Sequence, residues 1–213
     1  MPFIRSLLFP QENSCHLCGS FPDTGLLCKA CMKELLCLRI REETRPPASL
    51  MHACMAAFTH EGVARQMVHR LKYQHDPALA AIMGEHMAVS LGSFRADAVV
   101  PVPLYPKREE ERGYNQAALL AREVCFHTGL RCETHALKRI RPTDSQVGRT
   151  RGERLHAMCG AFTVPEPEKL QGKSILLVDD VLTTGATATA CAEALVQAGA
   201  QQVSLLVFGR TEL

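Results

Sequence analysis

Residues Ile175 to Thr187 read I-L-L-V-D-D-V-L-T-T-G-A-T. The four apolar residues Ile175 to Val178 are typical of a strand that is buried on both faces of a parallel sheet. Such a strand delivers Asp179 and Asp180 to its carboxyl end, which is where ligands bind in open α/β sheets. Two adjacent carboxylates repel each other unless the hydroxyl groups of a polyol or a magnesium ion offset their charge. The stretch therefore predicts an α/β fold with a ligand site at the end of this strand.

The turn that follows, Thr183 to Thr187, places three hydroxyl groups and a glycine where a helix is expected to begin. A helix start presents unpaired N–H groups and a positive dipole end, so it suits a phosphate, and Gly185 allows close approach. One alternative is a strand, turn and capped helix without a ligand. Another is a nucleotide triphosphatase, but Pro167 stands where a P-loop ending in Gly172-Lys173-Ser174 requires glycine.

Strands and helices alternate on both sides of this stretch, which implies a parallel sheet with crossover helices. Expected strands are Met51–Thr59, Ala96–Val102, Glu133–Lys138, Lys173–Val178 and Gln202–Phe208. Expected helices are Val63–Leu71, Asn115–His127, Ala186–Ala198, and one that Asp76-Pro77 opens and that runs to about Leu91.

The composition describes a folded globule of 213 residues with 46% apolar residues and a formal charge of +2. This charge gives no global case for nucleic acid, so any basic site must be local. No stretch approaches the roughly 20 apolar residues that span a bilayer, and the apolar run Leu7-Leu8-Phe9 is too short for a signal peptide. We therefore expect a cytoplasmic protein without membrane insertion.

Four of the ten cysteines, Cys15, Cys18, Cys28 and Cys31, form two C-x-x-C pairs that are separated by nine residues. Four thiolates close a tetrahedral structural zinc site, and His16 is then a bystander. Disulfides and an iron–sulfur cluster are the alternatives. Because a charged, proline-bearing stretch follows, we expect a zinc-binding segment over residues 1–45 and a larger domain over residues 46–213.

The segment 175–187 resembles the fingerprint of the type I phosphoribosyltransferase superfamily, which has four hydrophobic residues, two acidic residues and a T-T-G-x-T-like turn. The resemblance implies that Asp179 and Asp180 hold the ribose hydroxyls of phosphoribosyl diphosphate (PRPP), directly or through magnesium. It implies that the 5-phosphate is held by Thr183, Thr184, Gly185, Ala186 and Thr187. The expected diphosphate loop contains Val102, Pro103, Leu104, Lys107 and Arg108, although the charge run around Lys107 and Arg108, taken alone, favours a solvated surface.

The segment Pro142 to His156 is polar, contains glycine and is long for a connection inside an α/β domain. It carries Arg149, Arg151 and Arg154. It could close over a polyanionic ligand, contact a nucleic-acid backbone, or be a solvated loop.

Four motifs in order, P-V-P-L, R-G-Y-N-Q-A, T-x-x-Q with spaced arginines, and L-V-D-D-V-x-T-T-G-A-T, resemble the ComF family of competence-associated proteins from Cys15 to Arg210. The resemblance implies a PRPP-binding fold with a hood at about 47–94 and a core at about 95–213, and a role in handling DNA during natural transformation. It also implies a flexible loop that contains Gln146, Arg149, Arg151 and Arg154. Two positions depart from the family pattern. Arg149 stands where a leucine is usual. Relatives commonly carry R-x-x-N, whereas in this chain Arg154 is followed by Ala157.

Two functions remain open from the sequence. The chain could transfer the phosphoribosyl group to an unidentified acceptor without a nucleophilic triad, or it could be a module that only binds. For the second, candidate contacts to single-stranded DNA are Lys72, Tyr73, Arg112, Tyr114, Arg149 and Arg151. A zinc-stabilised scaffold without a ligand would leave the acidic pair unexplained. Expected cofactors are structural zinc and magnesium with PRPP, and expected partners are PRPP, single-stranded DNA and other DNA-uptake proteins.

Overall fold

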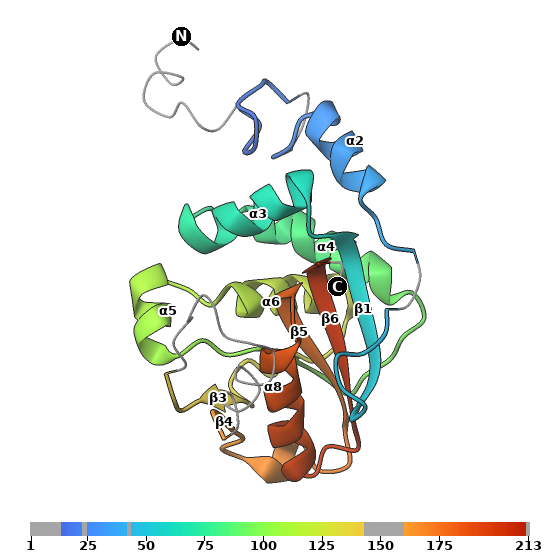
Figure 1. Cartoon of the computed structure of the whole chain (residues 1–213), viewed down its shortest axis with the longest axis vertical. Coiled ribbons are helices and arrows are strands. Elements are labelled where there is room, and N and C mark those ends of the chain that lie inside the picture. The colour runs from blue at the N-terminus through green and yellow to red at the C-terminus, as the bar shows by residue number, and fades with distance from the viewer. Residues whose placement is uncertain (1–13, 23–24, 42–43, 143–159, 212–213) are drawn as a thin grey trace.

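A four-stranded parallel sheet forms the centre of the molecule (Figure 1). The computed structural model describes residues 14–22, 25–41, 44–142 and 160–211. The elements within these ranges are α2 (Lys29–Cys37), β1 (Met51–Thr59), α3 (Gly62–Tyr73), α4 (Leu79–Leu91), β2 (Ala98–Pro101), α5 (Pro106–Arg112), α6 (Gln116–Thr128), β3 (Lys138–Arg139), β4 (Phe162–Thr163), η1 (Pro167–Lys169), β5 (Ser174–Leu182), α8 (Ala186–Gln197) and β6 (Gln202–Arg210).

The strand order in the sheet is β1-β6-β5-β2, and all three pairings are parallel. The carboxyl ends of the strands therefore meet at one edge. Strand β2 ends at Pro101, which pairs with Val178, whereas β5 continues to Leu182 beside β6. The acidic pair lies in this extension, so β5 has a neighbouring strand on only one side at Asp179 and Asp180.

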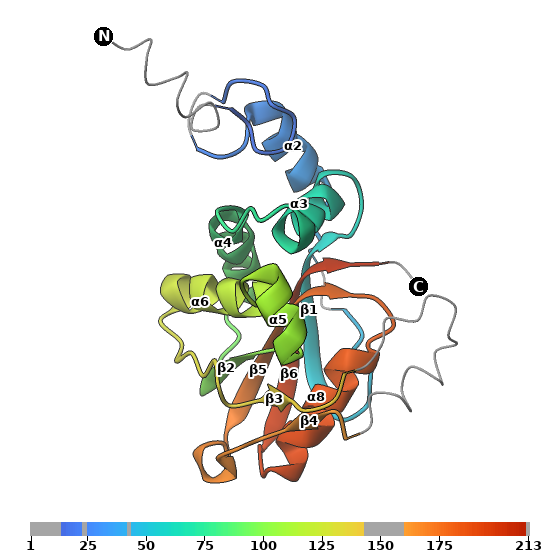
Figure 2. The same ribbon diagram turned by 90° about the vertical axis from the view of Figure 1, so that its left-hand side faces the viewer.

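Helices cover both faces of the sheet (Figure 2). Side chains alternate along β5, where Leu176 and Val178 face the core under α3, α4 and α6, and Ile175 and Leu177 face the core under α8. Burial on both faces removes apolar surface from water all along the strand, which explains why its sequence is a continuous apolar run.

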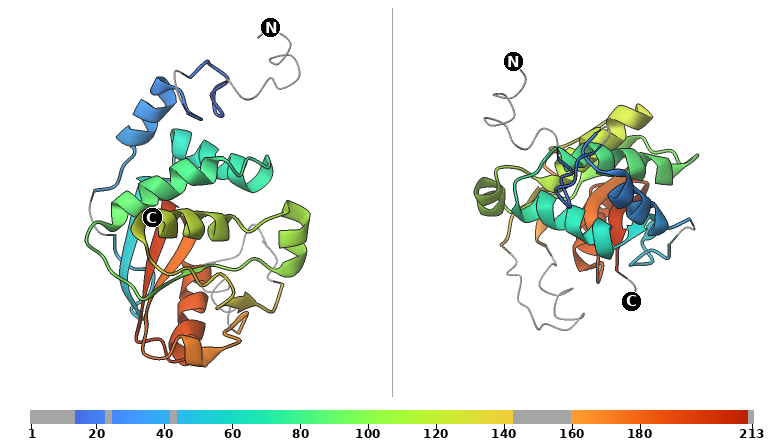
Figure 3. Two further views of the ribbon diagram at one scale, coloured as in Figure 1. Left: turned by 180° about the vertical axis from the view of Figure 1, so that it is seen from behind. Right: turned by 90° about the horizontal axis from the view of Figure 1, so that it is seen from above.

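The N-terminal segment, of which residues 14–22, 25–41 and 44 are described, lies beyond α3 and continues along the outer edge of β1 (Figure 3). The backbone N–H groups of Ile40 and Thr44 donate to the carbonyls of Ala57 and Cys54, both at 3.0 Å. These bonds run along the side of β1 that β6 does not cover. The segment therefore satisfies backbone groups on an edge that would otherwise be open to pairing.

The structure confirms the strands expected at 51–59, 96–102, 173–178 and 202–208, and it confirms the helices expected at 63–71, 115–127 and 186–198, with boundaries that shift by a few residues. Asn115 caps α6 because its Oδ1 accepts from the N–H groups of Ala117 and Ala118. The helices α2 and α5 were not predicted from the sequence.

The strand predicted at Glu133–Lys138 is wrong. The chain pairs earlier, where Val99 donates to the Arg131 carbonyl and Glu133 donates to the Val99 carbonyl, both at 2.8 Å. It then turns, and only Lys138–Arg139 forms a strand, antiparallel to β4.

The helix predicted to open at Asp76-Pro77 begins instead at Leu79, and its N-cap residue Ala78 makes no side-chain cap bond. Asp76 does not cap the helix, because its carboxylate lies 2.7 Å from Nδ1 of His16. No helix among the described residues has the length and apolar character that crossing a membrane requires.

Candidate ligand site and metal centre

The acidic pair lies at the carboxyl end of the sheet in two different environments. Asp180 is buried, with 2% of its surface exposed, whereas Asp179 is partly exposed. The backbone N–H of Asp180 donates to Oδ1 of Asp179 at 2.8 Å. Burial, and then the charge of Asp180, raise the pKa of Asp179 to about 7. The cations near this strand end therefore do not fully compensate the charge of the two carboxylates.

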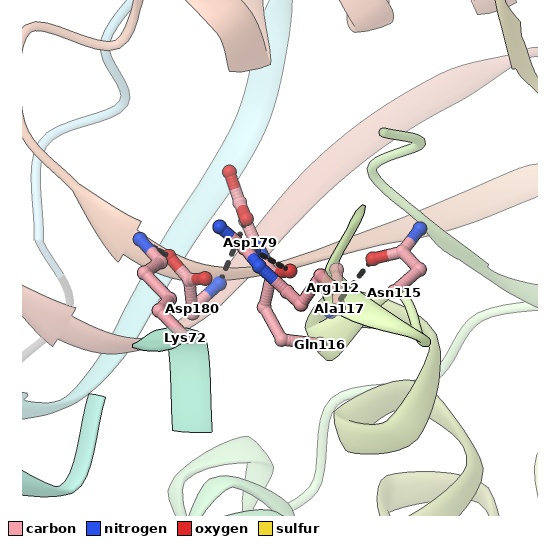
Figure 4. Close-up of polar contacts among 7 residues, drawn as sticks. All are labelled: Lys72, Arg112, Asn115, Gln116, Ala117, Asp179 and Asp180. Atoms are coloured by element: carbon pink, nitrogen blue, oxygen red, sulfur yellow. Dashed lines mark hydrogen bonds and ion pairs between the residues drawn. The ribbon is translucent and has the colours of Figure 1, made fainter. Parts of the chain in front are cut away.

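Lys72 supplies the nearest compensating charge. Its Nζ reaches from α3 and lies 2.6 Å from Oδ1 of Asp180, and the side chains are 23% and 3% exposed (Figure 4). Burial alone would lower the pKa of Lys72, but the carboxylates of Asp180 and Asp179 outweigh it, so this pKa is raised. Lys72 was predicted as a contact to DNA, and the structure places it against the acidic pair instead of on an open surface.

One carboxylate oxygen of the acidic pair has no hydrogen-bond partner among the described residues. Oδ2 of Asp180 is buried and accepts no hydrogen bond from any residue that the structure describes. A buried carboxylate oxygen without a donor is costly, and a ligand hydroxyl or a divalent cation would satisfy it. The donor set therefore fits both a ribose hydroxyl and a magnesium ion that a sugar diphosphate brings.

The predicted phosphate turn follows directly. Residues Thr183 to Thr187 line a small cavity of about 50 Å³, and Gly185 is the N-cap of α8. Gly185 has φ +78°, and a Cβ there would lie 2.2 Å from Cβ of Pro47. Glycine is therefore required both by the left-handed backbone and by close packing against Pro47. The sequence predicted close approach by a ligand, and the structure shows close approach by the chain itself.

The acidic pair and the predicted diphosphate turn share a cavity of about 330 Å³, which we call the acidic-pair cavity. Its lining includes Asp179, Asp180, Val102, Pro103 and Leu104, and also Thr183 and Thr187 from the phosphate turn. Nδ2 of Asn115 donates to the carbonyl of Val102 at 3.0 Å, which ties the turn to the start of α6. The structure therefore brings these three predicted segments together. Lys107 and Arg108 are exposed on α5 and do not line this cavity.

Four residues of the acidic-pair cavity were not named as site residues from the sequence, namely the apolar Val181 and the polar His60, Gln116 and Arg139. The guanidinium of Arg139 lies 5.7 Å from the ring centre of Phe162, and its buried Nε has no hydrogen-bond partner within the described ranges. Burial, and then the charge of Lys72, lower the pKa of His60, so its imidazole is neutral at pH 7. The cavity thus adds an unpaired cationic N–H group to the acidic pair.

Three of the predicted DNA contacts, Tyr73, Arg112 and Tyr114, lie beside this cavity. The guanidinium of Arg112 lies 5.6 Å from the ring centre of Tyr73 and donates a hydrogen bond to Gln116. Tyr73 is 62% exposed, and its ring centre also lies 5.1 Å from that of His69. The hydroxyl of Tyr114 donates to the Leu71 carbonyl at 2.6 Å and packs the cluster together. The predicted flexible-loop residues Gln146, Arg149, Arg151 and Arg154 lie outside the described residues.

The four predicted metal ligands form one cluster. The Sγ atoms of Cys15, Cys18, Cys28 and Cys31 all lie within 4.8 Å of one another, and those of Cys18 and Cys28 are 3.6 Å apart. A tetrahedral zinc with Zn–S bonds of about 2.3 Å places its sulfurs about 3.8 Å apart. The cluster therefore fits zinc. It is the only group of three or more potential ligands within the described ranges, and His16 faces Asp76 and does not join it.

Cys28 also connects the metal cluster to the fold. It is the N-cap of α2, and its Sγ accepts from the N–H of Cys31 at 3.5 Å. Cys15, Cys28 and Cys31 are buried in the same apolar core as residues of α3 and α4. The ligands are thus part of the packing between the N-terminal segment and the larger domain.

Comparison with known proteins identifies relatives along most of the chain. A family model described as phosphoribosyl transferase domain matches residues 110–210. The chain is 30% identical over 188 residues to competence protein ComFC of Bacillus subtilis (strain 168), and the match covers 87% of this chain and 72% of that protein. It is 30% identical over 152 residues to DNA utilization protein YhgH of Salmonella typhimurium (strain LT2), with 68% of this chain and 66% of YhgH covered.

A more distant likeness exists among solved structures. The allosteric regulatory enzyme of purine biosynthesis superimposes with a TM-score of 0.46 at 18% identity, over 66% of this chain and 30% of that one. The sequence relationship to ComFC is stronger, because it is 30% identical over 188 residues and covers 87% of this chain. The chain therefore belongs to the ComF family of competence proteins and contains a phosphoribosyl transferase domain.

Proposed function

We propose that this protein binds PRPP together with magnesium in the acidic-pair cavity. The observation that carries the proposal is that this one cavity joins the acidic pair, the Val102–Leu104 turn and the phosphate turn. A cavity of about 330 Å³ is at the lower end of the range for small-molecule sites. The three segments come from β2, β5 and the start of α8, which meet at the edge where α/β sheets bind ligands.

Each part of PRPP has a proposed partner. The ribose hydroxyls would donate to Asp179 and to the unpaired Oδ2 of Asp180. The 5-phosphate would accept bonds from the N–H groups and hydroxyls of Thr183 to Thr187. The diphosphate would lie toward Pro103-Leu104 and the guanidinium of Arg139. Magnesium, held by the carboxylates and the ligand oxygens, would neutralise part of the diphosphate charge.

The role of this binding belongs to DNA uptake or utilisation, because the relatives carry the names competence protein and DNA utilization protein. We propose that the exposed ring of Tyr73 and the nearby Arg112 contact single-stranded DNA beside the PRPP site. A protein that only binds PRPP releases no diphosphate, whereas one that transfers the phosphoribosyl group does. Release of diphosphate from PRPP in the presence of nucleobases or single-stranded DNA identifies the enzyme, and its absence with intact PRPP binding identifies the binding module.

Thermal unfolding with Mg-PRPP tests the site. A ligand at about 100 times its Kd adds about 2.7 kcal/mol, which for a chain of this size raises the Tm by about 5–10 °C. We expect this shift for the wild type and for Glu168→Gln, a matched charge change in η1 that does not line the cavity. The variants Asp179→Asn and Asp180→Asn should lose it. An undiminished shift in both variants would refute the site.

A further inference from the structure

A second cavity lies against the same phosphate turn. Its volume is about 390 Å³, and its wall is built by Arg45 to Ser49, Met51, Leu182 to Thr184 and Arg210. We call it the arginine cavity. Thr183 lines both this cavity and the acidic-pair cavity, and Thr183 and Thr184 also line the small phosphate cavity. A phosphate in the turn would therefore have open space on two sides.

The arginine cavity is positively charged. Ten of the residues that the structure describes line it; none of these ten is acidic, and two are arginines, the exposed Arg45 and the half-buried Arg210 at the carboxyl end of β6. In the part of the chain that the structure describes, neither guanidinium has a hydrogen bond or an ion pair. Guanidinium groups pair with phosphates through two parallel hydrogen bonds. An anionic ligand would thus supply what both arginines lack.

Five of the other eight described residues in the wall are apolar. Pro46, Pro47, Ala48, Met51 and Leu182 line it beside the hydroxyls of Ser49, Thr183 and Thr184. A cavity of this volume exceeds what a single phosphate needs and lies within the range for a nucleotide-sized ligand. The combination of two cations with an apolar wall suits a phosphate that is joined to a sugar and a base.

PRPP does not use this space, because its 5-phosphate is a terminal monoester. We propose that the phosphate turn also accepts a phosphodiester, and that the arginine cavity holds the nucleotide on its far side. The 3′-terminal nucleotide of a strand would then place its 3′-hydroxyl at the acidic pair and its 5′-phosphate in the turn, and the strand would continue past Arg45 and Arg210. This inference rests on the proposed PRPP site, since both ligands share the turn.

Competition binding tests the inference with a thymidine dinucleotide that carries a 5′-phosphate and a free 3′-hydroxyl. We expect it to displace labelled PRPP from the wild-type protein. A 3′-phosphate on the same dinucleotide should prevent binding, because a second anion would face Asp179 and Asp180. Thymidine 5′-diphosphate should bind at least about tenfold more weakly, because it lacks the second nucleoside that the apolar wall accepts. Binding without competition, or equal binding of the diphosphate, would overturn the assignment.

The arginines provide the second measurement. Arg45→Gln with Arg210→Gln should lower the affinity for the dinucleotide at least about tenfold more than the affinity for PRPP, since each charge-assisted bond contributes about that factor. Arg95→Gln is the matched control, because Arg95 is exposed near the start of β2, at the opposite edge of the sheet. Arg45→Gln alone, on an exposed side chain, keeps the test valid if the double variant does not fold.

The outcomes separate the two proposals. If the wild type does not bind PRPP, the proposed function fails. If PRPP binds but the dinucleotide does not, or if the arginine variants weaken both ligands equally, only the arginine cavity loses its assignment.

Discussion

Among single residues, Lys72 has the largest predicted effect on stability. Its ion pair with Asp180 is mostly buried, so removing the ammonium group leaves the buried Asp180 carboxylate without a counter-charge. We expect Lys72→Met to lower the free energy of unfolding by about 3 kcal/mol, as for other buried pairs that lose one partner. Urea denaturation near neutral pH measures the change.

A double-mutant cycle separates this charge effect from packing. Adding Asp180→Asn to Lys72→Met removes the stranded charge and should restore most of the lost stability. If the double variant is as unstable as the sum of the single variants, the ion pair is not coupled and the interpretation fails.

Asp179 gives stability a dependence on pH. Its pKa is raised to about 7 in the folded chain, so the native protein binds this proton more tightly than the unfolded chain does. Stability therefore falls as the pH rises from about 4 to about 7, by up to about 1.4 kcal/mol per pH unit from this group. Asp179→Asn should be more stable than the wild type at pH 8, and the difference should shrink at pH 5. Urea denaturation at both pH values measures it, and a difference independent of pH would contradict the burial argument.

The sequence identifies those site residues that stand next to one another in the chain. The acidic pair, the threonine turn and the cysteine pairs are local patterns, and each lies where the pattern predicts a cluster. Lys72 and Arg139 come from α3 and β3, which are distant in sequence from Asp180. No pattern in the sequence relates Lys72 or Arg139 to Asp180, because the tertiary fold determines which cation lies near the buried carboxylate.

At the scale of the element, the start of α8 depends on a glycine with two separate constraints. Ala at position 185 would strain the left-handed backbone and overlap Pro47. Ala at Gly129, which has φ +73° and no atom near its missing Cβ, carries the backbone strain alone. We expect Gly129→Ala to cost about 1–2 kcal/mol and Gly185→Ala to cost more and to weaken PRPP binding. Equal losses in urea denaturation, with PRPP binding intact, would show that Pro47 yields easily.

The cysteine cluster predicts about one zinc per chain. Cys28→Ser removes a ligand and the cap of α2 together, so metal content and the helical signal should fall in the same variant. Cys37→Ser is the matched control, because Cys37 lies in the same helix, is exposed and is not part of the cluster. Elemental analysis and circular dichroism measure both. Full zinc content in Cys28→Ser would exclude the four-thiolate site.

Elements that have a strong pattern were predictable and those that depend on tertiary contacts were not. The strand β5 was clear from its apolar run, although its extension through the acidic pair depends on pairing with β6. The segment Glu133–Lys138 has the pattern of a strand. Val99, however, forms its backbone hydrogen bonds with Arg131 and Glu133, at or before the start of this segment, and a turn follows. The helix α5 has no buried residue, so no apolar periodicity predicted it.

For the whole molecule, we propose that residues 1–45 and 46–213 act as a zinc-binding segment and a ligand domain that stabilise each other. The first part contributes Leu17, Leu27 and Leu35 to the core over α3, and its backbone covers the edge of β1. Residues 46–213 alone should therefore bind more of a hydrophobic dye and aggregate on concentration. Size-exclusion chromatography measures this, and a monomeric fragment with unchanged PRPP affinity would show that the two parts are independent.

The sheet order has a further consequence for synthesis in the cell. Strand β1 pairs only with β6 in this sheet, and their partners, such as Met51 and Val203, are about 150 residues apart. Contacts at such separation form late, because the chain between them must first be closed into a loop. While β1 emerges from the ribosome, its partner has not yet been translated. The cysteine-bearing segment has then already been translated. By bonding to the edge of β1 that β6 does not cover, it protects this strand of the nascent chain against pairing with strands of other chains.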